Sequence, residues 1–423
     1  MGEVGMDTWI WIGLCALALL VTTVAYPRVL TYALRHQIVD NPNERKLQRV
    51  PVPVMGGVVV WIGVVVTMLI IFFMKRDPYV LWIIVLLTVM FGIGVWDDMK
   101  NISAWGRFLV EILVVWAMIL IMRIEINDLH GLWGIYEISD SVSIPLSLIA
   151  GVGIINAVNL IDGVDGYCSS YGIIACVGFA IAFFIGGAVE LAVMASIFAV
   201  ALIPFFLHNV FGRKSKMFLG DGGSLMLGTL LTSFVFAMLT SGGPCEQLDA
   251  DRLSPVAFSL AIMAVPVFDT LRVMTSRILR GLSPFHPDKT HLHHLFIDLN
   301  FSHLATSYVI IGGNMFIMLC VLVAWQLGLS VDGQVYLVIV LGLWNTTGFY
   351  YWMRRQEPKS VDDDGTALYQ RVYRMGAKTH LSLSKGWTLL RDLMDSRLLG
   401  GREINPEIPL VPKDAVRPDP RIR

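Results

Sequence analysis

The chain has 423 residues, of which 55% are hydrophobic and 15% are charged, and its mean hydropathy is +0.66. Ordinary soluble domains have fewer apolar and many more charged residues, so this composition excludes them and predicts an all-α polytopic membrane protein. The formal net charge of −1 provides no overall positive field, which argues against nucleic acid as a partner.

About eleven apolar segments are long enough to cross a lipid bilayer as helices. They lie at about 8–32, 54–74, 79–96, 107–123, 143–161, 171–187, 189–208, 222–241, 256–275, 304–326 and 333–353. The first segment has no basic region before it and no clear small-residue cleavage site, which favours a retained span over a removed signal peptide. The segments 171–187 and 189–208 are divided only by Gly186 and Gly187, at the end of the first, and by Ala188.

Lys and Arg residues in the short loops predict the orientation of the spans, because these residues accumulate on the cytoplasmic side. One set of loops carries Arg35, Arg45, Lys46, Arg49, Arg213, Lys214, Lys216, Arg277, Arg280 and Lys289, whereas the other carries Lys75, Arg76, Arg123 and Arg252. The first set is predicted to be cytoplasmic. The N-terminus is then outside and, with an odd number of spans, the C-terminus is in the cytoplasm.

Two other segments differ from the spans in composition. Segment 124–141 combines apolar residues with two glycines and is predicted to form an external hairpin. Residues 354–423 form a predicted cytoplasmic tail with an acidic run at 362–364, an amphipathic stretch at 368–399 and a proline-rich end. We expect this tail to be partly helical with a disordered end. The five cysteines are scattered without Cys-x-x-Cys pairs, which indicates neither disulfides nor zinc.

The most informative polar stretch is 156–166, at the end of the fifth apolar segment. Asn156, Asn159 and Asp162 recur every three residues, so they share one face if the helix continues. Amides and carboxylates are costly to bury at the mouth of a membrane helix, and they indicate a functional site there. Oxygen ligands beside glycines suit Mg²⁺ and phosphate. The alternative is a polar turn rich in Asn, Asp and Gly.

A second polar cluster ends the third span, where Asp97 and Asp98 are adjacent. Neighbouring carboxylates repel each other, which raises the pKa of one of them unless a cation compensates. A bound metal, a lysine such as Lys100, or a role as proton acceptor would explain the pair. The alternative is an ordinary polar flank, although acidic residues oppose the dipole at a helix C-terminus.

A third cluster, 218–224, opens the eighth span with Gly220 and Asp221. Helix N-termini with glycines bind phosphate through free N–H groups, and a carboxylate there would hold the metal that bridges phosphates. The alternative is that Asp221 only caps the helix.

Two further loops complete the set. The first inner loop, 40–57, contains Arg45 and Lys46, which either hold phosphates or act only as topology signals. The loop after the ninth span contains Ser283, Asp288, His291, His293 and His294. The alternative is that these imidazoles bind zinc. However, no cysteine is near, and the histidines are spaced too closely for one tetrahedral site. Imidazoles that face a diphosphate fit better. All five clusters map to the predicted cytoplasmic ends, which favours one site at one membrane face.

Together the clusters resemble the polyprenyl-phosphate N-acetylhexosamine-1-phosphate transferases, glycosyltransferase family 4, and above all the bacterial WecA-type branch. The matching motifs are the paired aspartates 97–98, Asn-x-x-Asn-x-x-Asp-Gly-x-Asp-Gly at 156–166, the Gly-Asp-x-Gly-Ser loop at 218–224, and Ser-Pro-Phe-x-Pro-Asp with His-x-His-His at 283–294. The first loop is also similar. Gln48 departs from the family, since relatives often have His there, and the tail beyond Arg354 has no counterpart.

The resemblance implies a catalytic transmembrane domain at 1–353 that transfers GlcNAc 1-phosphate, or another N-acetylhexosamine 1-phosphate, from a UDP-sugar to undecaprenyl phosphate. The products would be undecaprenyl-diphosphate-sugar and UMP, the first membrane step of an envelope glycan such as lipopolysaccharide or another cell-wall polymer. It implies Mg²⁺ or Mn²⁺ as cofactor, a homodimer, and an active site on the cytoplasmic face of the bacterial inner membrane.

Residue roles follow from the same motif matches. The implied catalytic residues are Asp97, Asp98, Asp162, Asp165, His291, His293 and His294. The implied substrate-binding residues are Arg45, Lys46, Asn156, Asn159, Gly220, Ser283 and Asp288. The implied metal ligands are Asp221, Asp97 and Asp98. Direct attack by the lipid phosphate is simpler than a covalent Asp intermediate, and the sequence leaves both open.

Other functions compete with this interpretation. A transporter would place charges within its spans and often repeats one half, whereas these spans are nearly free of charge and no repeat is visible. A catalytically dead scaffold would be expected to lose carboxylates that are all present here. Within the transferase reading, UDP-MurNAc-pentapeptide is the alternative donor, and the absence of a distinctive peptide-binding segment favours UDP-GlcNAc.

Overall fold

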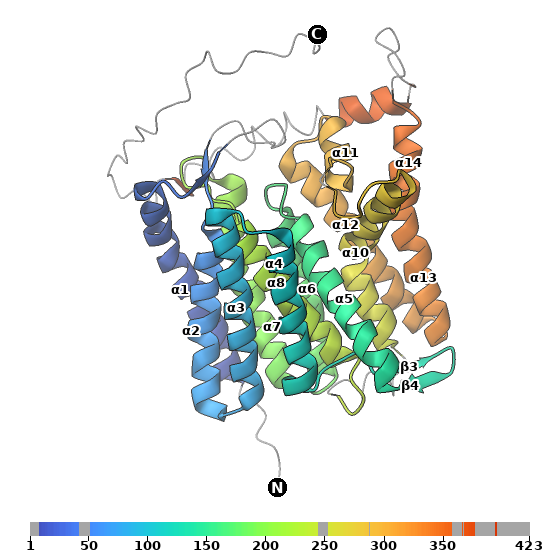
Figure 1. The fold of residues 1–423 in the computed structure, drawn as a ribbon, viewed down its shortest axis with the longest axis horizontal. Coiled ribbons are helices and arrows are strands. Elements are labelled where there is room, and N and C mark those ends of the chain that lie inside the picture. The colour runs from blue at the N-terminus through green and yellow to red at the C-terminus, as the bar shows by residue number, and fades with distance from the viewer. Residues whose placement is uncertain are drawn as a thin grey trace.

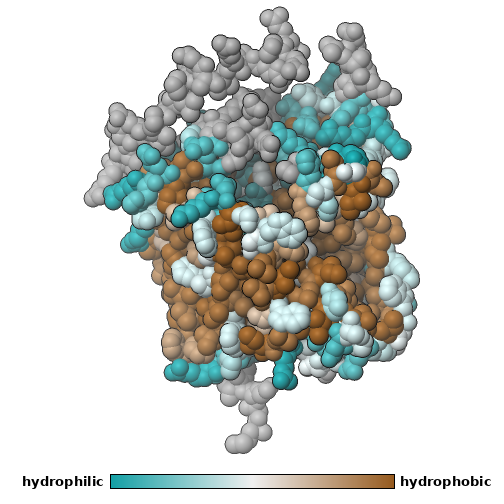
Figure 2. All heavy atoms as spheres, in the orientation of Figure 1, coloured by the Kyte–Doolittle hydropathy of each residue, from teal (hydrophilic) through white to brown (hydrophobic). Residues whose placement is uncertain are grey.

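The computed structural model describes residues 8–41, 51–243, 253–286, 288–357, 366, 368–376 and 394–395. This part of the chain forms a helical bundle with thirteen α-helices, and ten helices are long and apolar enough to cross a membrane. Figure 2 shows apolar side chains in a broad band around the middle of the bundle and hydrophilic ones at its two ends. The fold is therefore that of a multi-pass membrane protein, as predicted.

Ten of the predicted spans are confirmed as helices. They are α1 Thr8–Arg35, α2 Gly56–Lys75, α3 Pro78–Lys100, α4 Ala104–Ala117 with its π-helical continuation η1 Met118–Met122, α5 Asp140–Leu160, α6 Tyr167–Ile185, α7 Val189–Phe211, α8 Gly220–Met238, α10 Pro255–Leu279 and α12 His303–Gln326. The narrow division between the sixth and seventh predicted spans is real, because Gly187 adopts a positive φ of 79° in the turn between α6 and α7.

The eleventh predicted span, 333–353, is helical but is not one uniform apolar α-helix. It consists of α13 Val331–Leu343, the π-helical segment η2 Trp344–Gly348 and α14 Phe349–Arg354. The polar residues Asn345, Thr346 and Thr347 lie in the π-helical segment, which explains why this run is less apolar than the ten spans. A short helix, α11 Leu292–Asp298, lies between α10 and α12.

Helix α8 is the centre of the bundle. It packs against α2, α3 and α5, and every one of its residues except Asp221 is buried. Small residues permit this close packing: a Cβ added to Gly228 would lie 2.9 Å from the Cα of Ile155 on α5. The only side chain of α8 that reaches the surface is therefore the carboxylate at its first turn.

The helices run up and down the bundle, so the loops alternate between its two ends (Figure 1). Strands β1 Val39–Asp40 and β2 Val52–Pro53 pair at the end that carries the sequence motifs, whereas β3 Asp128–Leu132 and β4 Ile135–Glu137 form the hairpin predicted within 124–141 at the other end. Within the predicted tail, residues 368–376 are helical. The predicted disordered end lies outside the described residues.

Candidate active site

The site is built around the first turn of α8, and Asp98 of α3 binds this turn. The Asp98 carboxylate accepts hydrogen bonds from the backbone N–H groups of Asp221, at 3.0 Å, and Gly222, at 3.2 Å. A negative charge at a helix N-terminus is favourable, because it satisfies unpaired donors and complements the helix dipole. The approach requires two glycines: a Cβ at Gly220 would lie 2.6 Å from Asp98 Oδ2, and one at Gly94 would lie 2.4 Å from the backbone of Asp221.

Asp221 projects from this turn with one oxygen fixed. Asn159, in the last turn of α5, donates from Nδ2 to Asp221 Oδ1 at 2.7 Å and to Ser224 Oγ at 2.9 Å. The other oxygen, Asp221 Oδ2, lies 4.0 Å from the Arg107 guanidinium, and the side chain is 35% exposed. Asp221 is thus oriented by the protein while its side chain stays partly exposed.

Asp162 brings a third carboxylate to the same place. Helix α5 ends at Leu160, and Asp162 lies in the turn that follows. Its carboxylate faces the Gly220 N–H and the charges of Asp221 and Asp98. Burial and these two negative charges raise the pKa of Asp162 well above its ordinary value. Three carboxylates that repel one another at a helix N-terminus would be stabilised by a cation.

Their donor set fits Mg²⁺ or Mn²⁺. Carboxylate and amide oxygens are ligands of hard cations, and Mg²⁺ usually takes one or two carboxylates together with water and substrate phosphates. Among the described residues, no group of three or more His, Cys, Asp or Glu side chains is placed to hold a metal ion. An ion at this place would need water and the phosphates of the substrates to complete its coordination.

Asp97 is held by its own protein partners. Its Oδ1 accepts from the Ile102 N–H at 3.0 Å, and its Oδ2 pairs with Arg107 at 3.2 Å. The same Arg107 nitrogen lies 4.0 Å from Asp221 Oδ2, so the guanidinium stands between the two carboxylates and is closer to Asp97. The predicted metal role of Asp97 stays a prediction.

Asp165 is held in an ion pair on the other side of the turn. Its Oδ2 lies 2.6 Å from Lys216 Nζ and 3.1 Å from His303 Nδ1. Burial raises the pKa of Asp165, but the hydrogen bond from His303 and the nearby charges of His303 and Lys216 outweigh it and lower that pKa. Asp165 thus links the 162–166 turn to α12 and to the loop between α7 and α8.

The three predicted histidines form a stack at the start of α11. His291 Nδ1 pairs with Asp269 of α10 at 2.9 Å, and the rings of His291 and His293 are parallel with centroids 5.8 Å apart. Burial and the neighbouring imidazoles lower the pKa of His293 well below its usual value, and burial lowers that of His294 to about 4.

This stack meets the aspartate turn. A Cβ added to Gly163 would lie 3.2 Å from His293 Nε2. The buried Nε2 of His291 has no hydrogen-bond partner among the described residues, and a buried polar atom of this kind needs an explanation such as a ligand. The histidine loop is thus a wall of the same site.

Asp288 and Ser283 lie at the edge of the site. Asp288 pairs with Arg277 at 2.8 Å and Arg280 at 2.9 Å, and Thr290 Oγ1 donates to it at 2.7 Å. Ser283 is exposed and accepts from the Phe285 N–H at 3.3 Å. Their described contacts fold the loop, and their predicted role in substrate binding stays a prediction.

Several charged residues of the site are absent from the predicted set of site residues: Lys216, His303 and Asp269 described above, and Arg107 and Glu111. Arg107 of α4 pairs with Asp97 and, at 3.3 Å, with Glu111 one turn later. Glu111 is fully buried and accepts a hydrogen bond from the Asn156 side chain, so Asn156 faces α4 whereas Asn159 faces α8. The missed signal is a pair of opposite charges four residues apart in an apolar span.

Comparison with known proteins identifies the family of the chain. The family described as "Glycosyl transferase family 4" matches residues 80–239. The undecaprenyl-phosphate alpha-N-acetylglucosaminyl 1-phosphate transferase of Escherichia coli K12 is 30% identical over 271 residues, covering 63% of this chain and 70% of the relative. The protein of that name from Yersinia pestis is 29% identical over 273 residues, covering 64% and 72%.

A third relative is the decaprenyl-phosphate N-acetylglucosaminephosphotransferase of Mycobacterium leprae, at 31% identity over 314 residues, covering 68% of this chain and 76% of the relative. The chain belongs to glycosyl transferase family 4. It is therefore a membrane-bound phosphotransferase of the polyprenyl-phosphate N-acetylhexosamine-1-phosphate transferase type. The matched region 80–239 contains the Asp98, Asp162 and Asp221 cluster.

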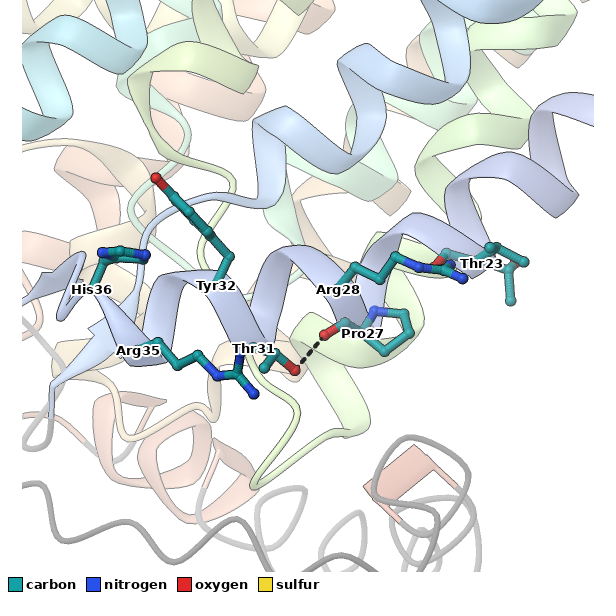
Figure 3. A pocket seen from close by; sticks show the side chains of 8 residues that line it. Thr23, Pro27, Arg28, Thr31, Tyr32, Arg35 and His36 are labelled. Atoms are coloured by element: carbon teal, nitrogen blue, oxygen red, sulfur yellow. Dashed lines mark hydrogen bonds between the residues drawn. The ribbon is translucent and has the colours of Figure 1, made fainter.

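A separate groove lies along the last turns of α1 and contains none of the motif residues. Figure 3 shows this groove along the last turns of α1, lined by Arg28, Tyr32, Arg35, His36 and their neighbours. None of the motif residues lines it, and it contains no carboxylate. The predicted phosphate ligands Arg45 and Lys46, and the departure at Gln48, lie outside the described residues.

Asp288 gives the site a pH-dependent contribution to stability. Although partial burial raises its pKa, hydrogen bonds from Arg277, Thr290 and Arg280 outweigh that effect and hold the pKa of Asp288 well below its ordinary value. A depressed folded pKa stabilises the fold above the unfolded pKa of about 3.9, and this stabilisation disappears as pH falls through the folded value. We expect Asp288→Asn to lower the thermal unfolding temperature at pH 7.

The difference from wild type should shrink as the pH falls below about 4. Thermal unfolding in detergent at pH 7, 4 and 3 measures it. Ser283→Ala, in the same loop, is the control and should give a difference that does not depend on pH. A gap for Asp288→Asn that stays constant down to pH 3 would contradict this assignment.

Proposed function

We propose that the chain transfers GlcNAc 1-phosphate from UDP-GlcNAc to undecaprenyl phosphate, which gives undecaprenyl-diphosphate-GlcNAc and UMP. The observation that carries the proposal is the convergence of Asp98, Asp162 and Asp221 on the N-terminus of α8. This arrangement suits a diphosphate with a divalent cation. The names of the relatives favour an N-acetylglucosaminyl donor and a polyprenyl-phosphate acceptor.

The proposed step is a direct displacement at phosphorus. An oxygen of the lipid phosphate forms a bond to the phosphorus that bears the sugar, the bond from that phosphorus to the UMP oxygen breaks, and UMP leaves with the electron pair. The acceptor phosphate is already ionised, so the barrier is mainly the approach of one anion to another. The protein's task is therefore to position the two substrates and to neutralise charge rather than to supply a nucleophile.

We assign the residues to this task by their contacts. Asp221, oriented by Asn159, and Asp162 would hold the divalent cation, while Asp98 fixes the helix that carries Asp221. When bound, the cation would neutralise charge on the diphosphate. Arg107, 4.0 Å from Asp221 Oδ2, adds positive charge beside this carboxylate.

The remaining groups would form the walls for the sugar and the phosphates. His291 and His293 are fixed at the edge of the aspartate turn and would donate hydrogen bonds to the diphosphate or the sugar. Arg45 and Lys46 would bind phosphate. The 1–353 region would be the catalytic domain.

We also propose that this end of the bundle faces the cytoplasm of a bacterium and that the protein lies in the inner membrane. Basic residues such as Arg35, Arg213 and Lys214 are at the motif end, in keeping with the accumulation of Lys and Arg in cytoplasmic loops. The N-terminus would then be outside and the C-terminal tail inside. A homodimer is the proposed assembly.

The test is UMP release by purified full-length protein with undecaprenyl phosphate and Mg²⁺. UDP-GlcNAc, UDP-GalNAc and UDP-MurNAc-pentapeptide are supplied in parallel, and samples without lipid measure plain hydrolysis. We expect lipid-dependent UMP from UDP-GlcNAc. Lipid-dependent UMP from a different donor alone would refute the sugar assignment, and no UMP from any donor with folded protein would refute the reaction.

A further inference from the structure

The C-terminal tail contributes one described residue, Asp395, to the loop between α7 and α8. Asp395 Oδ1 accepts hydrogen bonds from three consecutive backbone N–H groups, those of Arg213, Lys214 and Ser215, each at 3.2 Å. The Ser215 hydroxyl donates to the same oxygen at 3.0 Å. A carboxylate that accepts several N–H groups of one turn is a strong, charge-assisted anchor.

The loop that Asp395 binds rests on a buried platform. The Tyr26 hydroxyl of α1 donates to the Ser215 carbonyl at 2.8 Å, and His208 Nδ1 lies 3.2 Å from Ser215 Oγ. The rings of Tyr26 and His208 stack with centroids 4.2 Å apart. Ser215 is itself only 2% exposed. The loop is thus held by α1 and α7 on one side and by the tail carboxylate through its N–H groups.

The same loop leads directly into the site. The next residue after Ser215 is Lys216, whose Nζ lies 2.6 Å from Asp165 Oδ2. The Met217 carbonyl then accepts from Asn209, whose Oδ1 accepts from the Gly166 N–H at 2.7 Å. Three residues further, the chain starts α8. A shift of residues 213–215 would therefore move both the aspartate turn and the start of the central helix.

We propose that Asp395 is a positioning residue: it caps the loop between α7 and α8 and thereby fixes Lys216 against Asp165. Asp395, in the tail that the family resemblance does not cover, is then part of the active-site scaffold of this chain. The consequence for activity rests on the proposed function. The capping contact itself does not.

The experiment uses the full-length protein and the variants Asp395→Ala, Asp395→Glu and Asp392→Ala. Asp392→Ala removes a carboxylate from the same segment and is the matched control. Hydrogen–deuterium exchange measures the exchange rates of the backbone amides of residues 213–215, and this measurement does not depend on enzyme activity. Because hydrogen bonds to charged groups contribute about 1.5–3 kcal/mol, we expect exchange at these amides to rise about tenfold or more in Asp395→Ala. The control should leave it unchanged, and Asp395→Glu should restore part of the protection.

The second measurement is a double-mutant cycle on UMP release. We expect Asp395→Ala to lower kcat by about tenfold, since small displacements of a positioned group are costly. If Asp395 acts through Lys216, adding Asp395→Ala to Lys216→Ala should cost much less than it costs in wild type. Thermal unfolding of each variant separates this coupling from a general loss of stability.

Two results would overturn the proposal. One is unchanged exchange at 213–215 in Asp395→Ala, which would show that the carboxylate does not cap the loop. The other is a double variant whose fold-loss of kcat equals the product of the losses in Asp395→Ala and Lys216→Ala. That result would show that Asp395 does not act through Lys216. If the wild type releases no UMP from any donor, the proposed function fails, and the exchange measurement alone decides whether the capping contact exists.

Discussion

Asp221→Asn should reduce lipid-dependent UMP release by about a thousandfold, a loss of ~4 kcal/mol of transition-state stabilisation. The substitution removes a carboxylate whose side chain is 35% exposed and whose Oδ2 lies 4.0 Å from the Arg107 guanidinium. It keeps an acceptor for Asn159, and the Asp98 contact uses only the backbone N–H of residue 221. The helix should therefore stay in place while the charge that holds the cation is lost.

Two measurements separate this role from a structural one. Thermal unfolding should show Asp221→Asn close to wild type, and titration with Mg²⁺ should show half-maximal activity at a higher concentration than in wild type. Asp332→Asn is the matched control, because Asp332 caps Trp133 at the other end of the bundle. A folded Asp221→Asn protein with near-normal UMP release at low Mg²⁺ would exclude Asp221 as the metal ligand.

The spans could be predicted because hydropathy alone determines them. A helix that faces lipid needs about twenty apolar residues in a row, so ten predicted segments agree with the observed helices within a few residues. The run Val331–Arg354 was harder to predict, since its polar middle is accommodated by a π-helical segment. The local composition of the chain is therefore sufficient to predict the spans, and no knowledge of long-range contacts is needed.

The site is different, because its geometry depends on contacts between distant parts of the chain. The motif at 156–166 predicts one polar face, yet Asn156 turns to Glu111 and Asn159 turns to Asp221. Asp165 is paired with Lys216, 51 residues away, and no spacing within the motif indicates this partner. The motif identifies candidate site residues, whereas the packing of α4, α5 and α8 decides which carboxylate stays available to bind a cation.

The buried Glu111 is another site residue whose role depends on contacts with distant parts of the chain, and its contribution to stability can be measured. We expect Glu111→Ala to lower the free energy of unfolding by roughly 1–3 kcal/mol, since it removes a buried hydrogen-bonded partner, although Arg107 keeps its pair with Asp97. Arg107 would lose its 3.3 Å partner, and the Asn156 side chain would lose an acceptor. Denaturant unfolding in detergent measures the change. Glu190→Ala, which breaks a surface pair with Lys75, is the matched control and should cost less than about 1 kcal/mol.

A double variant separates the fold from the chemistry. Replacing a buried ion pair by apolar residues of similar size is often neutral for stability, so Arg107→Met with Glu111→Leu should recover most of the stability that Glu111→Ala loses. Asn156 would keep its bond to the Val152 carbonyl at 2.9 Å. Activity should not recover, because the guanidinium that lies 4.0 Å from Asp221 Oδ2 is gone. Recovery of both would show that Arg107 serves only to neutralise Glu111, and recovery of neither would show that the pair is needed for folding itself.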